Sequence, residues 1–179
     1  GIYGAMNKGI ELASGEIIGL INSADWCDKN ALATIANSFH PDIDCYYSDI
    51  HIVFEKFNAI KKKMASFNYY QGMPICHQSL FITKKVYKKL GLYDLQYRFL
   101  ADYDFFMRMQ MHTTFEFHYV PNAIIYFQEG SSGSTHQNTV AVESLKVAKH
   151  YLSIPGLALF LLYWIKDLSM SSLRLWMFK

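Results

Sequence analysis

The chain lacks any strong excess of one charge. Its 179 residues carry 17 Lys and Arg against 15 Asp and Glu, a formal charge of +2, and the basic residues are scattered along the sequence. Because no basic patch is evident, we expect no nucleic-acid partner. The one tight basic run, Lys61-Lys62-Lys63, predicts a solvated loop, with contact to phosphate or to an anionic membrane surface as the alternative.

Cysteine is scarce as well. Cys27, Cys45 and Cys76 are odd in number and lack the spacing of metal ligands, which favours reduced, mostly buried thiols of a cytosolic protein. The chain does not open with the charged and then apolar pattern of a signal peptide. Residue 1 is Gly rather than Met, and a helix is expected almost at once, so we expect the remainder of a longer protein.

Long apolar runs are also missing. Near the C-terminus, Pro155 to Ile165 contains eleven residues with no charge, which falls short of the ~20 residues that span a bilayer. Beyond it, Lys166, Arg174 and Lys179 alternate with apolar residues, which predicts a basic amphipathic helix. Residues 155–179 therefore either lie in a membrane interface or pack on the core, and both readings stay open.

What is present is enough for one domain with a core, since 51% of the residues are hydrophobic and 18% are charged. Periodicity and breakers predict a strand–helix–strand order at the start, and hence an α/β fold with a mainly parallel sheet. The expected helices cover about residues 5–13, 29–39, 84–90, 101–111, 138–152 and 155–176, and the expected strands 16–21, 43–50, 51–57 as a returning hairpin strand, 77–82, 115–120 and 123–127. Residues 58–76 form a long loop in this prediction.

Asn22-Ser23-Ala24-Asp25-Trp26 directly follows the apolar strand Glu16 to Ile21. A carboxylate at the carboxyl end of a buried strand lies where open α/β sheets bind ligands. Asp25 is therefore the first candidate for chemistry, and a cap on the following helix is its structural alternative, although Asp28 is better placed for that role.

This turn resembles the Asn-Ser-Asp-Asp-Trp form of the metal-binding motif in inverting GT-A glycosyltransferases of the family 2 type, with Ala24 in place of the first carboxylate. Further segments resemble the same family in the same order. They are Gly1 to Gly9, His77-Gln78, Gly91 to Asp94, Ala101 to Asp104 with Arg108, and Phe127 to Ser132 with Glu129 in place of a Gly. Gly4 also stands where that family has an acidic residue.

The resemblance implies a catalytic base and a metal ligand. Asp102 is the implied base that takes the proton of the acceptor hydroxyl, and Asp25 is the implied ligand of a divalent metal, Mn or Mg. Asp104 is implied to contact the acceptor or the sugar; two residues from Asp102 on a helix, it points in another direction. The alternative role for one of the two carboxylates is to cap the helix or balance its dipole, and Arg108 can pair with Asp104 one turn away.

The remaining implied site residues divide between the two substrates. Asn7, Lys8 and Asn22 are implied, with Asp25, to bind the donor, and Lys8 is otherwise a solvent-exposed side chain. His77 and Gln78 are implied to bind the acceptor or sugar, unless His77 is a satisfied core residue. His136 could reach the metal or the diphosphate when the Gly/Ser loop before it closes, although a surface histidine is the plainer reading.

The family implies a three-layer α/β/α GT-A fold, the nucleotide-diphospho-sugar transferase fold, N-terminally truncated here. It divides the chain into a partial GT-A domain at residues 1–135 and C-terminal helices at 136–179. The implied reaction transfers a sugar from a nucleotide-sugar, UDP-linked by expectation, to a saccharide or lipid-linked acceptor on the cytoplasmic side of a membrane. The rival reading is a non-catalytic relative that keeps the scaffold as a binding module, because Gly4 and Ala24 remove donor-site carboxylates.

Overall fold

The computed structural model describes residues 1–54, 59–63, 68, 70, 73–112, 114–128 and 136–177, with side chains described outside 59–63 and 167–177. Its helices are α1 (Ile2–Leu12), α2 (Ala31–Asn37), the short 3-10 helix η3 (His77–Ser79), α3 (Lys84–Leu90), α4 (Ala101–Met111), α5 (Gln137–Tyr151) and α6 (Ile154–Met177). Its strands are β1 (Ile17–Gly19), β2 (Trp26–Cys27), β3 (Cys45–Tyr47), β4 (Ile50–Phe54), β5 (Ala59–Lys63), β6 (Leu80–Thr83), β7 (Phe117–Tyr119) and β8 (Ile125–Gln128).

The strands form two four-stranded sheets, ordered β1-β6-β3-β7 and β2-β8-β4-β5. Parallel pairing joins β3 to β7 and β4 to β8, whereas the other four pairings in the described part of the chain are antiparallel. The predicted α/β class is confirmed, but the prediction of a mainly parallel sheet is wrong. In the first sheet, β6 lies between β1 and β3 and runs antiparallel to both. The GT-A arrangement itself stays a prediction.

The segment predicted as a hairpin of residues 43–50 and 51–57 is arranged differently. Strand β3 ends at Tyr47, and β4 begins at Ile50 in the other sheet, so the two do not pair. The hairpin partner of β4 is β5, with Ile50 opposite Lys63. The run Lys61 to Lys63 therefore lies in a strand, and the loop predicted there is wrong, since strand pairing overrides the low β propensity of lysine.

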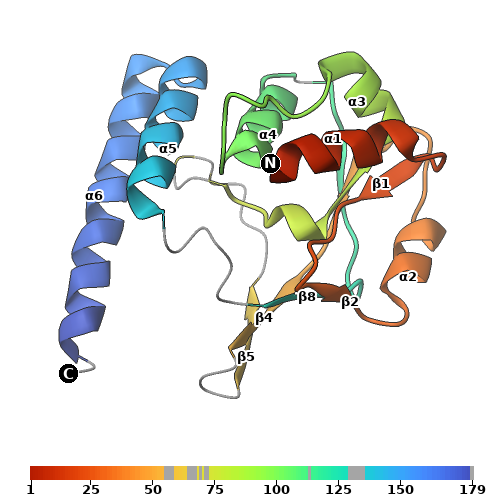
Figure 1. Cartoon of the computed structure of the whole chain (residues 1–179), viewed down its shortest axis with the longest axis horizontal. Coiled ribbons are helices and arrows are strands. Elements are labelled where there is room, and N and C mark those ends of the chain that lie inside the picture. Colours follow the sequence, from red (N-terminus) through yellow and green to blue (C-terminus); the bar gives the residue numbers. More distant parts are fainter. Residues whose placement is uncertain are drawn as a thin grey trace.

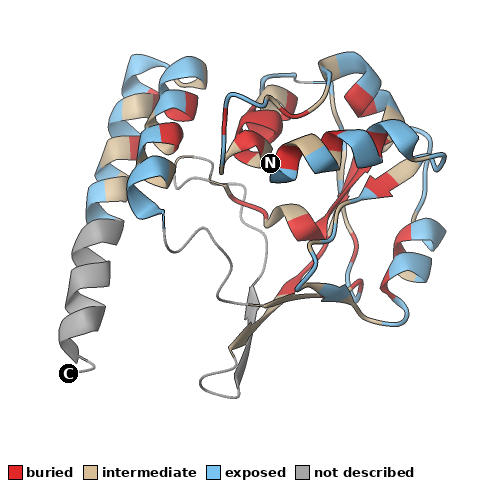
Figure 2. Ribbon diagram, in the orientation of Figure 1, coloured by how far each residue is buried: buried red, intermediate tan, exposed pale blue. Residues whose placement is uncertain are grey.

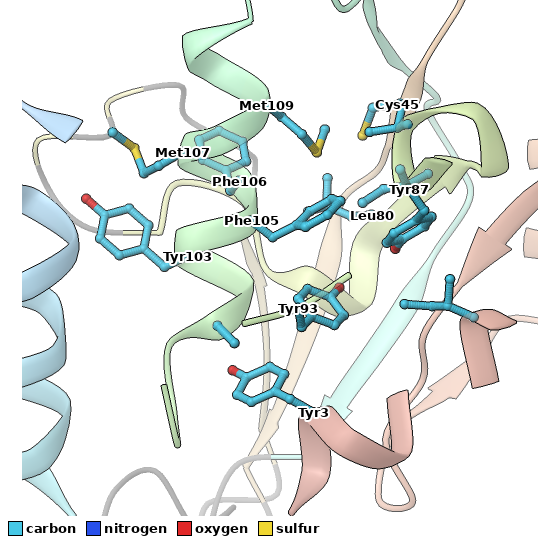
Figure 3. Packing of buried hydrophobic residues seen from close by; sticks show 14 of the residues in the cluster. Tyr3, Cys45, Leu80, Tyr87, Tyr93, Tyr103, Phe105, Phe106, Met107 and Met109 are labelled. Carbon is cyan, nitrogen blue, oxygen red and sulfur yellow. The ribbon is translucent and has the colours of Figure 1, made fainter. Parts of the chain in front are cut away.

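Helices cover both faces of the first sheet (Figure 1). Alternating side chains explain this, because Cys45 and Ile82 pack with the larger core cluster, whereas their neighbours Tyr46 and Phe81 pack with the smaller one that contains residues of α2. In the larger cluster, the ring of Phe105 on α4 lies 5.0 Å from that of Tyr87 (Figure 3). This packing fixes α4, and with it the start of the site described below.

The helix pair α5 and α6 flanks the α/β part beside α4 (Figure 1). Buried residues lie on the side of α5 that faces the rest of the molecule (Figure 2), and Val147 and Ala148 are fully enclosed. On α6, Leu159, Leu162 and Ile165 are exposed. Within the described residues, no helix combines the length and apolarity needed to cross a bilayer.

The residues at the helix ends explain where several helices begin and stop. Helix α4 has the bounds expected from sequence, and α3 lies between Thr83 and a glycine, Gly91, with a positive φ of 83°. Asp28 does not cap α2 itself; the N-cap is Asn30, whose N–H donates to Asp28 Oδ1 at 3.0 Å. In β1, a Cβ at Gly19 would come within 2.7 Å of the Phe81 ring, so this glycine allows the ring to pack against the strand.

Some of the sequence predictions lie outside the described residues. They concern Tyr69 and Gly72 of the long loop, Glu129, the Gly/Ser segment 130–134, Phe178 and Lys179. Of the three thiols, all described, Cys45 is buried, whereas Cys27 and Cys76 are half-buried, so the expectation of mostly buried cysteines is met only by Cys45.

Candidate active site

A cavity of about 680 Å³ lies where the start of α1, the turn after β1, η3 and the start of α4 meet. Its polar lining includes Tyr3, Asn22, His77, Asp102 and His136, and its apolar lining includes Met73 and Phe127. The volume is that of a site for a small organic ligand. We call it the α4 cavity, because the first turn of α4 supplies its carboxylate.

Asp102 lines the α4 cavity and has three partners among the described residues. Its Oδ1 accepts hydrogen bonds from the Tyr3 hydroxyl at 2.8 Å and from the Tyr103 N–H at 2.9 Å, and its Oδ2 lies 3.2 Å from His77 Nδ1. Burial alone would raise the pKa of Asp102, but the hydrogen bonds and charge of His77, with those from Tyr3 and Tyr103, hold it below its ordinary value. Asp102 is therefore ionised at neutral pH, with only 14% of its side chain exposed.

His77 is placed by η3, the single helical turn that precedes β6. Its ring bridges two segments, because Nδ1 contacts Asp102 and Nε2 lies 3.4 Å from Asn22 Nδ2. Only 15% of the His77 side chain is exposed, and it lines the α4 cavity. Three residues implied separately by the resemblance, Asn22, His77 and Asp102, are thus brought together in one chain of contacts.

Tyr3 is a site residue that sequence reasoning missed. Its hydroxyl lies 2.7 Å from the Phe99 carbonyl oxygen and 2.8 Å from Asp102 Oδ1, so its one proton can serve either acceptor. Burial, followed by the negative charge of Asp102, raises the pKa of Tyr3 well above its ordinary value, which keeps it a donor. The available signal was its place inside the Gly1 to Gly9 segment that carries the family resemblance.

Glu143 of α5 was also missed. Its carboxylate accepts hydrogen bonds from three consecutive backbone N–H groups, those of Arg98, Phe99 and Leu100, at 2.8 to 3.0 Å. These groups immediately precede α4, where a helix start leaves donors unsatisfied and a negative charge is favourable. The sequence signal that could have identified Glu143 is its position four residues before Val147, which places a charged residue on the buried face of α5. Glu143 thereby ties α5 to the wall of the α4 cavity.

Asp104 faces away from this chain of contacts. Its Oδ2 accepts a hydrogen bond from Arg108 Nε at 3.0 Å and its Oδ1 accepts one from the Tyr151 hydroxyl at 2.8 Å. Arg108 also donates to the backbone carbonyls of Leu90 and Leu92. The predicted Asp104–Arg108 pair is confirmed, and the network joins α4 to α5 and to the end of α3. Asp104 is not among the described residues that line the α4 cavity.

Asp25 lies in the turn between β1 and β2. Its Oδ2 accepts a hydrogen bond from Gln78 Nε2 at 3.1 Å, and its Oδ1 accepts one from the Gln128 N–H at 3.1 Å. Gln78 is buried and adjacent to His77, so the His77-Gln78 pair touches Asp102 with one side chain and Asp25 with the other. The structure therefore links the two carboxylates that the resemblance singled out.

Asn7 and Lys8 of α1 have different surroundings. Asn7 is buried and exchanges two hydrogen bonds with the backbone of Tyr93, donating to its carbonyl at 2.9 Å and accepting from its N–H at 3.0 Å. Both ends of this amide are used in holding α1 to the segment after α3. Lys8 is exposed to solvent. Neither is among the described residues of the α4 cavity.

His136, the N-cap residue of α5, lines the α4 cavity and stacks on Phe99 with a centroid separation of 5.0 Å. Asp25 is not in the described lining of that cavity. Among the residues that the structure describes, no three His, Cys, Asp or Glu side chains form a group able to hold a metal ion.

Comparison with known proteins gives one consistent result. No protein-family model matches the chain. Over 114 residues, 60% of its length, the chain is 32% identical to proteins named PGL/p-HBAD biosynthesis glycosyltransferase from Mycobacterium bovis (strain BCG / Pasteur 1173P2) and Mycobacterium tuberculosis (strain ATCC 25177 / H37Ra). The match covers 43% of each relative's own length. Over more than half of its residues, the chain is thus similar to glycosyltransferases.

Proposed function

We propose that this chain carries the acceptor side of a glycosyltransferase site, which transfers a sugar from a nucleotide-diphospho-sugar to an acceptor hydroxyl with inversion. The observation that carries the proposal is Asp102, an ionised and largely buried carboxylate on the wall of a cavity large enough for a sugar. The similarity to named glycosyltransferases supports the same reaction class.

Inversion by direct displacement needs a negative group that draws the proton from the acceptor hydroxyl as the new bond forms. Asp102 supplies that charge, and Tyr3, Tyr103 and His77 hold it in one orientation. Preorganised contacts of this kind reduce the rearrangement needed on the way to the transition state. Asn22, His77 and Gln78 are proposed to meet the sugar that moves, and Asp104 to act by fixing α4.

A divalent cation, Mn or Mg, is proposed at Asp25. Mg is commonly held by one or two carboxylates together with substrate phosphates, so a single carboxylate fits such a site. Gln78 and the Gln128 N–H each occupy one lone pair of Asp25 and fix its direction, which leaves a further lone pair on each oxygen. When bound, the cation would neutralise charge on the leaving diphosphate. His136 is proposed as an additional ligand, and Asn7 and Lys8 as donor-side residues of α1.

We propose a UDP-sugar as the donor and a saccharide or lipid-linked acceptor, used on the cytoplasmic side. A lipid-linked acceptor would bring the chain to a membrane surface. Residues 155–179 are proposed as the membrane contact, because Leu159, Leu162 and Ile165 of α6 are exposed apolar side chains. Removal of residues after Ile154 should then abolish binding to anionic vesicles, and binding unchanged by the truncation would contradict this part.

The function is tested by calorimetric titration of the chain with a panel of UDP-hexoses in the presence of MnCl₂. We expect at least one donor to bind, with binding weakened by Asp25→Asn and unchanged by Asp42→Asn, whose side chain is 86% exposed. Absence of binding to every donor would contradict the proposal for this chain.

A non-catalytic binding module is the second candidate. Ala24 and Gly4 favour it, since the family pattern has an acidic residue at each of these positions. Ala24 is exposed, and Gly4 is half-buried with nothing within 4 Å of a Cβ built on it. This candidate predicts donor binding without release of the nucleoside diphosphate. A release assay on the same donors therefore separates the two functions.

A further inference from the structure

We propose that Glu143 of α5 is a positioning residue for Asp102, the carboxylate assigned above as the base. This role rests on the proposed sugar transfer and adds a residue from the C-terminal helices to the groups on which that reaction depends. Glu143 is not among the described residues that line the α4 cavity. It acts instead through the backbone that leads into α4 and through Tyr3.

One face of α5 is turned toward the α4 cavity. His136, the N-cap residue, is followed by Val140 and Glu143 at spacings of four and three, so the three lie on the same side of the helix. His136 and Val140 line the cavity. Glu143 accepts hydrogen bonds from the backbone N–H groups of residues 98–100, and these residues line the cavity as well. Helix α5 therefore forms part of the cavity wall and holds another part in place.

The peptide unit between Phe99 and Leu100 links Glu143 to Tyr3. Its N–H donates to Glu143 Oε2 at 3.0 Å, and its carbonyl oxygen lies 2.7 Å from the Tyr3 hydroxyl. Because a trans peptide unit is planar, fixing its N–H also fixes the direction of its carbonyl group. The Tyr3 hydroxyl is thereby held between two acceptors, this carbonyl and Asp102 Oδ1 at 2.8 Å.

The two oxygens of Asp102 have different surroundings. Oδ1 accepts hydrogen bonds from the Tyr3 hydroxyl and the Tyr103 N–H, whereas the described residues give Oδ2 one partner, His77. A carboxylate oxygen has two lone pairs, so Oδ2 keeps one for the proton of an acceptor hydroxyl. The donors to Oδ1 determine where Oδ2 lies. Tyr3 is one of these donors, and Glu143 fixes the carbonyl beside which its hydroxyl is held.

The charge of Glu143 supports the same arrangement. Burial, followed by the negative charge of Asp102, raises the pKa of Tyr3, and the charge of Glu143 adds to this rise. Tyr3 therefore keeps the proton that it donates to Asp102. A Gln at position 143 would remove the charge and turn an NH₂ donor toward the N–H donors of residues 98–100.

Two variants test the positioning role. Glu143→Gln removes the charge and keeps the length of the side chain, whereas Glu143→Asp keeps the charge and withdraws it by one methylene group. The matched control is Val147→Ala. Val147 is fully buried one turn further along the same face of α5 and lies outside the described lining of the α4 cavity. Its truncation weakens the packing of α5 without removing a hydrogen bond.

Release of UDP from the UDP-hexose that binds best is measured in MnCl₂, and urea denaturation gives the stability of each protein. We expect both Glu143 variants to lower kcat by at least about tenfold, with the donor KM within about threefold of wild type. Val147→Ala should keep kcat within about threefold. A kcat of the Glu143 variants within about threefold of wild type, or an equal loss in Val147→Ala, would overturn the proposal and leave the proposed function standing.

The same assay in an Asp102→Asn background shows whether Glu143 acts through Asp102. Residues that act as a unit are not additive, so Glu143→Gln should change the remaining rate by less than about twofold there. A further loss of about tenfold would mean that Glu143 acts independently of the base, which contradicts the positioning role.

A second measurement does not depend on turnover. The side-chain carbon-13 resonance of Asp102, assigned with Asp102→Asn, reports the pKa of this carboxyl as the pH is lowered. The hydrogen bond from Tyr3 favours the ionised form, so loosening it in Glu143→Asp should raise the pKa of Asp102, whereas Val147→Ala should not. An unchanged pKa in Glu143→Asp would overturn the proposal. If wild type releases no UDP from any donor, the proposed function fails, and this titration still decides whether Glu143 positions Asp102.

Discussion

The start of α4 and the turn after β1 hold their polar groups in different ways. At the start of α4, Asp102 has three partners, and Glu143 of α5 satisfies three successive backbone N–H groups. In the turn after β1, the described residues give the Asp25 side chain two partners and the Asn22 side chain one long contact, and the exposed Ala24 offers no polar side chain.

This difference indicates how the site is divided. The start of α4 is fastened by the protein itself, so its groups hold their geometry before any substrate binds. Among the described residues, the turn after β1 has fewer polar contacts of its own, and under the proposed function the donor diphosphate and a cation would complete it. Changes near the start of α4 should therefore affect stability or chemistry, whereas changes in the turn should affect donor binding.

The largest expected effect on stability comes from Asp104→Ala. It leaves the partly buried guanidinium of Arg108 without its carboxylate and the Tyr151 hydroxyl without its acceptor. Breaking such a pair should lower the free energy of unfolding by about 3 kcal/mol, as measured by urea denaturation. Asp42→Asn is the exposed control, and a loss below about 1 kcal/mol for Asp104→Ala would show that α4 is not fastened by this network.

The second effect concerns the turn. Asp25→Asn should weaken binding of a UDP-hexose in MnCl₂ by at least about tenfold, or roughly 1.4 kcal/mol, because the amide is a poorer cation ligand than the carboxylate. With EDTA in place of MnCl₂, the two proteins should bind the donor equally. An equal loss with and without the metal would mean that Asp25 acts on the fold or on the sugar.

The third effect is the pH dependence of the stability that Asp102 contributes. Its pKa is lower in the folded chain than in the unfolded chain, so the unfolded chain binds the proton first as the solution is acidified. The stability that this ionised carboxylate provides is present above about pH 4 and is lost as the pH falls through the folded pKa. The difference in unfolding free energy between wild type and Asp102→Asn should therefore shrink between pH 6 and pH 3. A constant difference would contradict the assignment.

The smallest effect is expected for Ala24→Asp, which restores the carboxylate of the family pattern. Because Ala24 is exposed, the free energy of unfolding should change by no more than about 0.5 kcal/mol. Donor binding in MnCl₂ should become tighter, as calorimetry would show. Unchanged binding would indicate that the turn is not on the donor side.

Sequence reasoning succeeded where the signal is local. The bounds of α4 and the place of Gly91 follow from periodicity and a helix stop, and both were predictable. Strand partners were not, because β6 enters the sheet between β1 and β3, and nothing in the spacing of these strands fixes that order.

For the candidate site, too, the residue types were predictable from the sequence and the contacts between them were not. His77 and Asp102 were each singled out, but their contact depends on how η3 meets α4, 25 positions further along the chain. Tyr3 and Glu143 were missed because they act on another side chain or on backbone N–H groups that only the folded chain brings near. Residue type could suggest a carboxylate and a histidine, but their partners are a property of the tertiary structure.

The most direct test of the account is the release of nucleoside diphosphate from a panel of UDP-hexoses with MnCl₂, measured for wild type and Asp102→Asn. The account predicts release by wild type and at least about 100-fold slower release by Asp102→Asn, with donor binding retained in both. Equal release by the two proteins, or no release by wild type from any donor, would contradict it.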